Sequence, residues 1–458
     1  MKILLFGTGK KYKAYKDKFA QYEIVYLLDN DKDKQGMFLD GIEIVSPSKG
    51  VSVYYDAVFI LSVYAETMKE QLISLGVEGE RIFSYKDAER LKDCVLCYGD
   101  MLLRERREAK KRILIFTDNL RLTGAQVVLL DAVRIFKNNN FDVIVVAQDD
   151  GPMLQLFISE DVYVVIDAGI SVFHLTTIDW IRKLDPTLIF VNTIFMQHLF
   201  KCSALKIPVI WWLHDSEAIY KWVQCNGLND YYHDNIKALA VSRLAREPFV
   251  TRCPDWPVEL LPYGIKDIEE PRDVNTQSNK LVFATIGAIE ERKGQDILFQ
   301  AIECLSYEER KECEFWLIYQ PIVPSDYADV VVGKSSLFPE VKMIGQIKHE
   351  KMGEMYRKIS VLICPSSSDT LPTVTVEAMQ NCIPCVVSDG TGTADYIENF
   401  KNGFVFPARN ANILAERIRW MIRNKEKISS MGLEARQIYK KYFSIEVFEK
   451  NLMEIVKS

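Results

Sequence analysis

The sequence predicts an α/β protein in which parallel sheets are built three times along the chain. Apolar strand-like runs alternate with helical patterns almost throughout, which is typical of parallel sheets. This alternation restarts after a charged stretch that ends at Arg112, and again after a proline-containing segment at 254–264. The length of 458 residues is too great for one hydrophobic core and predicts two or three domains.

The first region covers residues 1–95, with buried strands expected at 3–6, 24–28 and 57–62. A linker of residues 96–111 follows it. Glutamates are interleaved with the arginines and lysines of this linker, so we expect a solvated helix here and not a nucleic-acid-binding element.

A glycine turn follows the first strand of this region. Gly7 and Gly9 begin a G-x-G-x-x-G pattern, but Tyr12 stands where the third glycine belongs. Asp29 ends the second strand, where a ribose-binding acid is found in dinucleotide folds. One interpretation is a nucleotide site at Gly7, Gly9 and Asp29. The other is a structural or docking role for the region.

Two further regions carry longer series of strands. For residues 112–268 the expected strands are 113–116, 141–146, 188–191, 209–213 and 238–242, with a helix beginning near Ala125. For residues 269–440 they are 281–286, 315–318, 361–364 and 384–388. Two doubly wound lobes in tandem form a cleft at their facing strand ends, where such sheets bind ligands.

Composition excludes several classes of protein. The net charge of -6 gives no general attraction to nucleic acid or anionic membranes. No apolar stretch approaches the roughly 20 residues that span a bilayer. The ten cysteines form no paired C-x-x-C clusters, so Cys94 and Cys97 are interpreted as reduced thiols on a helix. The N-terminal apolar run is too short for a secretion signal, and we expect a cytoplasmic protein.

The loop and helix at 366–379 carry a candidate anion site. Asp369 lies in the loop, Thr373 is expected at the N-cap or in the first turn, and Glu377 lies one to two turns further on. The helix start offers free N–H groups and a positive dipole end to an anion such as a diphosphate. The alternative is that Asp369 is only a cap and Glu377 a surface residue.

A second candidate element follows the first strand of the same region. Gly287 forms a turn at the carboxyl end of the strand, and Lys293 with Gly294 begins the next helix. A lysine at this place can grip a phosphate as a point charge, whereas Arg292 is interpreted as part of a solvated turn. Two such elements on one region predict an anion-binding site.

From about Arg112 to Ser458 the chain resembles the metal-independent retaining glycosyltransferases of the GT-B fold, the family 4-like or "group 1" glycosyltransferases. The resemblance depends on an ordered set of motifs: Thr123-Gly124-Ala125, His214-Asp215, Val241-Ser242, residues 261–265, Arg292-Lys293-Gly294, Cys364-Pro365-Ser366, the acid-x7-Glu element of Asp369 and Glu377, Ser388-Asp389-Gly390 and residues 402–405.

The resemblance implies a fold and a division of labour. Two Rossmann-like lobes would enclose a cleft, preceded by a small Rossmann-like accessory domain at 1–95. Residues 112–268 would form the acceptor side and 269–440 the nucleotide-sugar donor side. The terminal helix, 441–458, would cross back to the first lobe.

The resemblance also implies roles for particular residues. Lys293 would grip the diphosphate, Glu377 would hold the donor ribose, Asp369 would lie near the transferred sugar, and His214 near the reacting centre. The catalytic set would be Lys293, Asp369 and His214. The remaining donor positions would be Gly124, Gly287, Arg292, Gln346, Ile347, Leu371, Pro372 and Thr373.

Three positions depart from the family pattern. Asp369 is shorter than the usual glutamate, Ala288 stands where an arginine is often found, and Tyr263 replaces an asparagine. Arg292 is the candidate substitute for the missing arginine. The departures support an alternative in which the chain is an inactive glycosyltransferase-like partner of another enzyme. A sugar phosphorylase or epimerase of the same fold is a further alternative.

The implied reaction is transfer of a glycosyl group from a nucleoside-diphosphate sugar to an acceptor hydroxyl, with retention and without a metal. A UDP-sugar is favoured over a GDP-sugar, and no other cofactor is implied. The acceptor would be a glycan, a glycoprotein or a lipid-linked sugar in bacterial polysaccharide or glycan assembly. Nucleic acid is not an expected partner. Peripheral contact at the inner face of the membrane, and homo- or hetero-oligomers through the accessory domain, are compatible with the resemblance.

Overall fold

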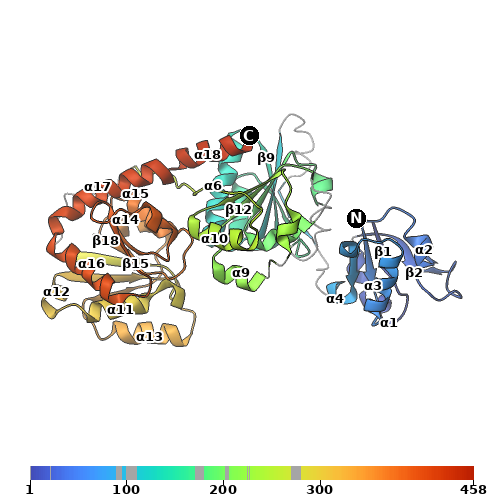
Figure 1. Ribbon diagram of the computed structural model, residues 1–458, viewed down its shortest axis with the longest axis horizontal. Helices are drawn as coiled ribbons and strands as arrows, with labels where there is room; N and C mark the ends of the chain where they lie inside the picture. The colour runs from blue at the N-terminus through green and yellow to red at the C-terminus, as the bar shows by residue number, and fades with distance from the viewer. Residues whose placement is uncertain are drawn as a thin grey trace. The chain divides into compact units, whose positions relative to one another are not determined.

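The computed structural model describes residues 2–20, 22–88, 95–99, 111–170, 180–201, 206–223, 225, 227–269 and 280–457 (Figure 1). It separates into two compact units. Unit 1 joins Met1–Leu122 with Phe136–Val209, and unit 2 joins Thr123–Ile135 with Ile210–Ser458. The predicted α/β class is confirmed, since the sheets of the described residues are parallel apart from the pairs β3–β4 and β7–β10.

Unit 1 begins with a six-stranded sheet in the order β3-β4-β2-β1-β5-β6. The first strand lies in the middle and the order reverses beside it, as in a Rossmann fold. The prediction of a separate N-terminal α/β domain is therefore confirmed. Its elements are β1 (Lys2–Phe6), α1 (Lys10–Tyr15), β2 (Glu23–Leu28), β3 (Phe38–Leu39), β4 (Ile42–Val45), α2 (Pro47–Gly50), β5 (Ala57–Ile60), α3 (Ala65–Ser74), β6 (Ile82–Ser84) and α4 (Tyr85–Ala88).

Unit 1 also holds strands in the order β11-β8-β9-β10-β7. Their bounds are β7 (Leu96–Tyr98), β8 (Arg112–Asn119), β9 (Asp142–Asp149), β10 (Tyr163–Ile166) and β11 (Leu188–Asn192), with helices α6 (Gly124–Asn138), which ends in this unit, and α7 (Met153–Ser159).

The helix predicted around Cys94 and Cys97 is wrong at Cys97. This residue lies in β7 and pairs antiparallel with β10, so backbone pairing at a sheet edge overrides the helical interpretation. Cys94 and most of the predicted linker helix lie outside the described residues.

Unit 2 contains the strands β12 (Val209–Leu213), β13 (Ile236–Ala240) and β14 (Val258–Leu260), with α9 (Glu217–Val223) and α10 (Arg243–Arg252). Its parallel six-stranded sheet has the order β17-β16-β15-β18-β19-β20. The strands are β15 (Leu281–Ile286), β16 (Cys313–Ile318), β17 (Val341–Ile344), β18 (Val361–Cys364), β19 (Cys385–Ser388) and β20 (Gly403–Phe406).

Helices cover both faces of this sheet, with α11 and α13 on one side and α15 and α17 on the other (Figure 1). Apolar strand residues of one face form a core with α11, α13, α16 and the start of α17, and the alternate strand residues are buried on the other face. Near-continuous apolar runs therefore appear in β15 and β18. The helices are α11 (Gln295–Glu303), α12 (Tyr307–Lys311), α13 (Asp326–Ser335), α14 (His349–Tyr356), α15 (Thr373–Gln380), α16 (Ala411–Arg423), α17 (Ile428–Ile438) and α18 (Ile445–Lys457).

The strand order reverses between β15 and β18. The helices that follow these two strands, α11 and α15, therefore lie on opposite faces of the sheet, and ligands bind at such a point in open α/β sheets. This topological switch point brings together the two elements that the sequence singled out, after β15 and after β18.

Helix α18 packs on β12 within unit 2. The Phe448 ring stacks on Trp212 with centroids 5.3 Å apart and an interplanar angle of 18°. The backbone N–H of Ile445 donates to the carbonyl of Ile265 at 3.0 Å, and a Cβ at Gly264 would overlap the Ser444 carbonyl. No helix among the described residues is both long enough and apolar enough to cross a membrane.

We expect Phe448→Ala to lower the free energy of unfolding of unit 2 by about 3 kcal/mol or more, because it removes a fully buried ring. Denaturant titration followed by circular dichroism measures this change. Leu433→Ala is the control, since this side chain on α17 is 49% exposed and should cost about 0.5 kcal/mol. Equal losses in the two variants would contradict the packing described for α18.

Candidate functional site

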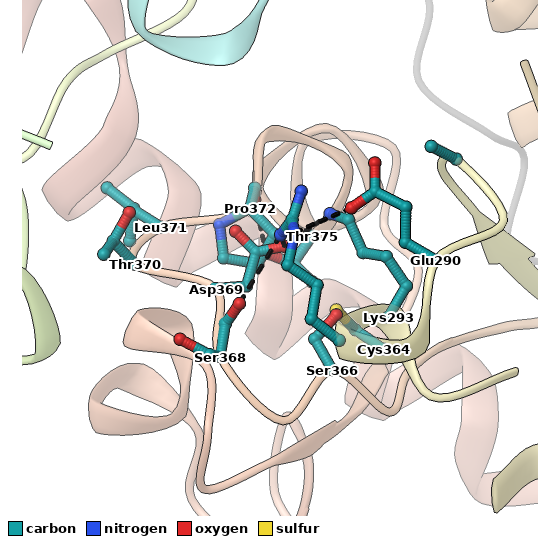
Figure 2. Close-up of polar contacts among 12 residues, drawn as sticks. Glu290, Lys293, Cys364, Ser366, Ser368, Asp369, Thr370, Leu371, Pro372 and Thr375 are labelled. Carbon is teal, nitrogen blue, oxygen red and sulfur yellow. Dashed lines mark hydrogen bonds and ion pairs between the residues drawn. The ribbon is translucent and has the colours of Figure 1, made fainter. Parts of the chain in front are cut away.

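An ion pair lies at the switch point of the unit 2 sheet. Lys293 Nζ lies 2.6 Å from Asp369 Oδ2, and both side chains are largely buried, with 17% and 13% of their surface exposed. Lys293 ends a short helical turn after β15, and Asp369 lies in the loop after β18 (Figure 2). The structure thus brings together two residues that are 76 positions apart and that the sequence assigned to one site.

Glycines on either side of Lys293 shape its turn. Gly287 has φ 147°, a conformation that favours glycine, and a Cβ there would lie 3.7 Å from Lys293 Cε. Gly294 has φ 69°, and a Cβ there would overlap the carbonyl oxygen of Pro365. The Ser367 N–H donates to the Arg292 carbonyl at 2.7 Å. The two loops are therefore held against each other by their backbones.

The Asp369 backbone is fixed on both sides. Its N–H donates to the Gly390 carbonyl and its carbonyl accepts from the Gly392 N–H, both at 2.9 Å. The interpretation of Asp369 as a helix cap is wrong, because Pro372 occupies the N-cap of α15 without a side-chain cap. The Asp369 carboxylate is instead turned to Lys293.

Residues that follow β12, β13 and β14 hold the same loop. The Ser242 hydroxyl donates to the Thr370 carbonyl, and the Thr370 hydroxyl donates to the His214 carbonyl at 2.7 Å. The Tyr263 hydroxyl donates to the Leu371 carbonyl at 2.8 Å. Tyr263, a departure from the family pattern, thus positions the loop that carries Asp369.

Arg292 lies at the edge of the pair. Its Nε lies 2.8 Å from Glu290 Oε2, and its Nη1 lies 3.9 Å from Asp369 Oδ2. The side chain is 48% exposed. The structure therefore places Arg292 beside the pair, with Glu290 as its nearer ion-pair partner.

Glu377 lies on α15 and is half-buried. The Tyr356 hydroxyl, at the end of α14, donates to Glu377 Oε2 at 2.5 Å. Burial, together with the Glu377 charge, raises the pKa of Tyr356 well above its ordinary value, so this hydroxyl stays a donor. The sequence analysis did not identify Tyr356, because the sequence around Glu377 gives no signal for a hydrogen-bond partner on a different helix.

The residues before Glu377 form the entry to α15. Leu371 is buried and Pro372 is the N-cap (Figure 2). Thr373 is the first residue of the helix. The prediction of Thr373 in the first turn is confirmed, whereas its alternative position at the N-cap is wrong because Pro372 takes that place. The three residues predicted to contact the donor thus lie just before or at the start of a helix at the switch point.

His214 follows β12 and is uncharged at neutral pH. Burial lowers its pKa to about 3, and its Nε2 is buried without a hydrogen-bond partner among the described residues. The ring packs edge-on against Trp212, with centroids 4.4 Å apart. His214 therefore contacts the Asp369 loop through its backbone carbonyl. Its imidazole is neutral, so one ring nitrogen can donate a hydrogen bond and the other can accept one.

The remaining predicted donor residues lie on other elements. Gly124 begins α6 and is exposed, and Gln346 and Ile347 lie in the loop after β17. The contacts of the described residues bring none of the three to Lys293 or Asp369. Within the described residues no group of three or more His, Cys, Asp or Glu side chains could hold a metal ion.

In the N-terminal sheet, Gly7 and Gly9 lie in the loop after β1, and Asp29 lies in the loop after the neighbouring strand β2. Asp29 Oδ2 accepts from the Thr8 N–H at 3.3 Å, from the Thr8 hydroxyl, and from Lys34 Nζ at 3.3 Å. Burial raises the pKa of Asp29, but the hydrogen bonds from Thr8, the Asp31 backbone and Lys34 outweigh it and leave the pKa below its ordinary value.

The position of the third glycine in this pattern is filled. Tyr12 is 2% exposed in the core, and its hydroxyl donates to Asp40 at 3.0 Å. A side chain of this size replaces the close helix–strand approach that a glycine allows. The Asp29 carboxylate holds its own turn, and nucleotide binding there stays a prediction.

Parallel sheets of Rossmann order, with a lysine–carboxylate pair and a helix start at one switch point, agree with the lobes of a GT-B fold. The comparison with protein families agrees. Residues 266–438 match the family model described as glycosyl transferases group 1, and residues 109–242 match glycosyl-transferase family 4. Residues 1–83 match a third model, C2185-like, N-terminal. The chain thus resembles the GT-B glycosyltransferases and carries an additional N-terminal domain.

Similar proteins share parts of the chain. The uncharacterized glycosyltransferase MJ1178 of Methanocaldococcus jannaschii is 27% identical over 157 residues, which are 34% of this chain and 42% of that protein. The chain therefore matches less than half the length of this curated relative.

Solved structures show the same fold. HepE of Anabaena in complex with UDP-glucose has a TM-score of 0.61 at 18% identity, over 76% of this chain and 99% of that one. Sucrose-phosphate synthase of Thermosynechococcus elongatus has a TM-score of 0.63 at 15% identity, over 76% and 98%.

We expect Gly294→Ala to destabilise unit 2 by at least about 2 kcal/mol, because the new methyl group meets the Pro365 carbonyl at a left-handed backbone position. Gly333→Ala is the matched control. Gly333 lies in α13 with no atom within 4 Å of the added carbon, so the same substitution should stabilise by about 0.5–1 kcal/mol. Denaturant titration of both variants measures the change in the free energy of unfolding, which should be a loss for Gly294→Ala and a gain for Gly333→Ala. An unchanged free energy of unfolding in Gly294→Ala would contradict the close approach of the loops.

The low pKa of His214 predicts a pH-dependent stability. Below the ordinary pKa of 6.5 the unfolded chain binds a proton at this residue, whereas the folded chain stays neutral down to about 3. Acid therefore favours the unfolded state. Between pH 7 and pH 5 wild type should lose about 2 kcal/mol of unfolding free energy relative to His214→Gln. His233→Gln, at an exposed histidine, should keep the wild-type slope. Parallel curves for wild type and His214→Gln would contradict the burial of this ring.

Proposed function

We propose that this chain is a glycosyltransferase that moves a sugar from a nucleoside-diphosphate sugar to an acceptor hydroxyl. The observation that carries the proposal is the Lys293–Asp369 pair at the switch point of a Rossmann-ordered sheet. A UDP-sugar is the proposed donor, supported by the fold shared with HepE, which was solved with UDP-glucose.

The proposed chemistry is stabilisation of the leaving diphosphate. Breaking the bond to the sugar leaves additional negative charge on the departing phosphate. A lysine held in place and backbone N–H groups at a helix start stabilise that charge without reorganising during the step. The Lys293 side chain is paired with Asp369, the turn around it depends on Gly287 and Gly294, and α15 begins at Thr373. Asp369 neutralises Lys293.

We include in this proposal that configuration is retained and that the reaction does not depend on a metal. Lys293 supplies a positive charge where a divalent cation would otherwise neutralise the diphosphate. Asp369 is proposed to accept hydrogen bonds from the hydroxyls of the transferred sugar, and neutral His214 to lie near the reacting centre. Glu377, oriented by Tyr356, is proposed to hold the ribose hydroxyls.

The acceptor and the cellular compartment are proposed from the resemblance to the glycosyltransferase family. The acceptor is a glycan, a glycoprotein or a lipid-linked sugar in polysaccharide or glycan assembly, and the enzyme is cytoplasmic. The rival proposal is a catalytically inactive partner of another enzyme, favoured by Ala288 and by the short side chain at Asp369.

Calorimetric titration with UDP and GDP tests the donor site. UDP should bind wild type, and Lys293→Ala should weaken binding on the order of 10- to 100-fold, because it removes a charge-assisted contact. Glu377→Gln should weaken it on the order of tenfold. Lys401→Ala is the control, since Lys401 is exposed and paired with Glu398.

The outcomes separate the alternatives. A wild type that binds no nucleotide contradicts the enzyme proposal. Unchanged UDP affinity in Glu377→Gln contradicts the ribose assignment alone. UDP binding without turnover of any UDP-sugar supports the inactive partner. Where turnover is seen, NMR of the product's anomeric proton tests retention, and turnover in EDTA tests independence from metals.

A further inference from the structure

A pocket of about 310 Å³ adjoins Asp369. Its walls come from the start of α9, from one face of α10 and from the loop at 367–370. Asp369 belongs both to this pocket and to the pair with Lys293, whereas Lys293 does not line it. The pocket therefore lies next to the proposed donor site and is formed within unit 2.

The charged residues that line the pocket are all acidic. Three carboxylates line it, those of Glu217, Glu247 and Asp369, and no lysine or arginine is among the described lining residues. Arg252 neutralises Glu217 through two contacts of 2.8 and 2.9 Å, and Lys293 neutralises Asp369. Glu247 is exposed and makes no ion pair with a described residue. One uncompensated negative charge thus remains in the pocket and repels an anion.

Hydroxyl groups and an apolar wall complete the lining. The hydroxyls of Ser216 and Ser368 make no hydrogen bond with a described residue, so both are available to a ligand. Figure 2 shows Ser368 beside Asp369. Leu244 and Pro248 lie one turn apart on the α10 face that borders the pocket. A sugar ring matches this lining, because it presents hydroxyl edges and apolar C–H faces.

We propose that this pocket binds the sugar ring of the acceptor, and that the ring is neutral or carries an amino group, without carboxylate or phosphate. The proposal rests on the proposed function. Because Lys293 does not line the pocket, the diphosphate is assigned to the other side of Asp369. Glu247 is the specificity-determining residue, since its free charge attracts an ammonium group and repels a carboxylate.

Three simple sugars test the proposal: glucosamine, glucose and glucuronate. Each is added to the protein saturated with UDP, and binding is followed by saturation-transfer NMR at neutral pH. Glucosamine should bind most tightly and glucuronate most weakly. Glu247→Lys reverses one charge, so the affinity ratio of glucosamine to glucuronate should fall on the order of fivefold or more. Glu247→Gln should give an intermediate ratio.

Glu416→Lys is the matched control. Glu416 is also an exposed helix glutamate without an ion pair to a described residue, but it lies on α16 and does not line the pocket. The affinity ratio of glucosamine to glucuronate in Glu416→Lys should equal that of wild type. Glucuronate binding as well as glucosamine, or an unchanged ratio in Glu247→Lys, would overturn the inference. So would a UDP-loaded protein that binds none of the three sugars. Failure to bind UDP would instead overturn the proposed function.

Discussion

The candidate site depends on the close approach of two loops at the switch point of the unit 2 sheet. The loop after β15 and the loop after β18 meet where Gly294 passes the Pro365 carbonyl, and where the Ser367 N–H donates to the Arg292 carbonyl. Backbone contacts of this kind tolerate little displacement, because neither partner can rotate away as a side chain can. They fix the end of the turn that carries Lys293 relative to the loop that carries Asp369.

The loop after β18 is also the meeting point of more distant parts of unit 2. Ser242 and the His214 carbonyl bond to Thr370, and Tyr263 bonds to Leu371, from strand ends that belong to a different part of the sequence. The side chain of Asp369 is therefore positioned by contacts that do not touch it. The same arrangement explains why Tyr263 can stand where an asparagine is usual, since its hydroxyl reaches the Leu371 carbonyl.

Two polar clusters illustrate how similar residues acquire different tasks. In the N-terminal sheet, the Asp29 carboxylate accepts hydrogen bonds from Thr8 and Lys34, and Tyr12 occupies the position of the third glycine of the pattern. Both features stabilise the turn itself. At the unit 2 switch point, Lys293 and Asp369 neutralise each other across two loops. This ion pair joins two separate loops, whereas the Asp29 carboxylate also accepts from the Asp31 N–H of the turn in which it lies.

The sequence alone determined the α/β class and the extra N-terminal domain, and it predicted Lys293, Asp369 and Glu377 as site residues. Strand periodicity, glycine turns and helix starts are local, so they are legible in consecutive residues. Only the tertiary structure decided that Tyr356 orients Glu377, that His214 is neutral, and that Cys97 lies in an edge strand. Each of these depends on which elements become neighbours and how deeply a group is buried. Pairing between strands and desolvation are set by the assembled fold and leave no mark in the local sequence.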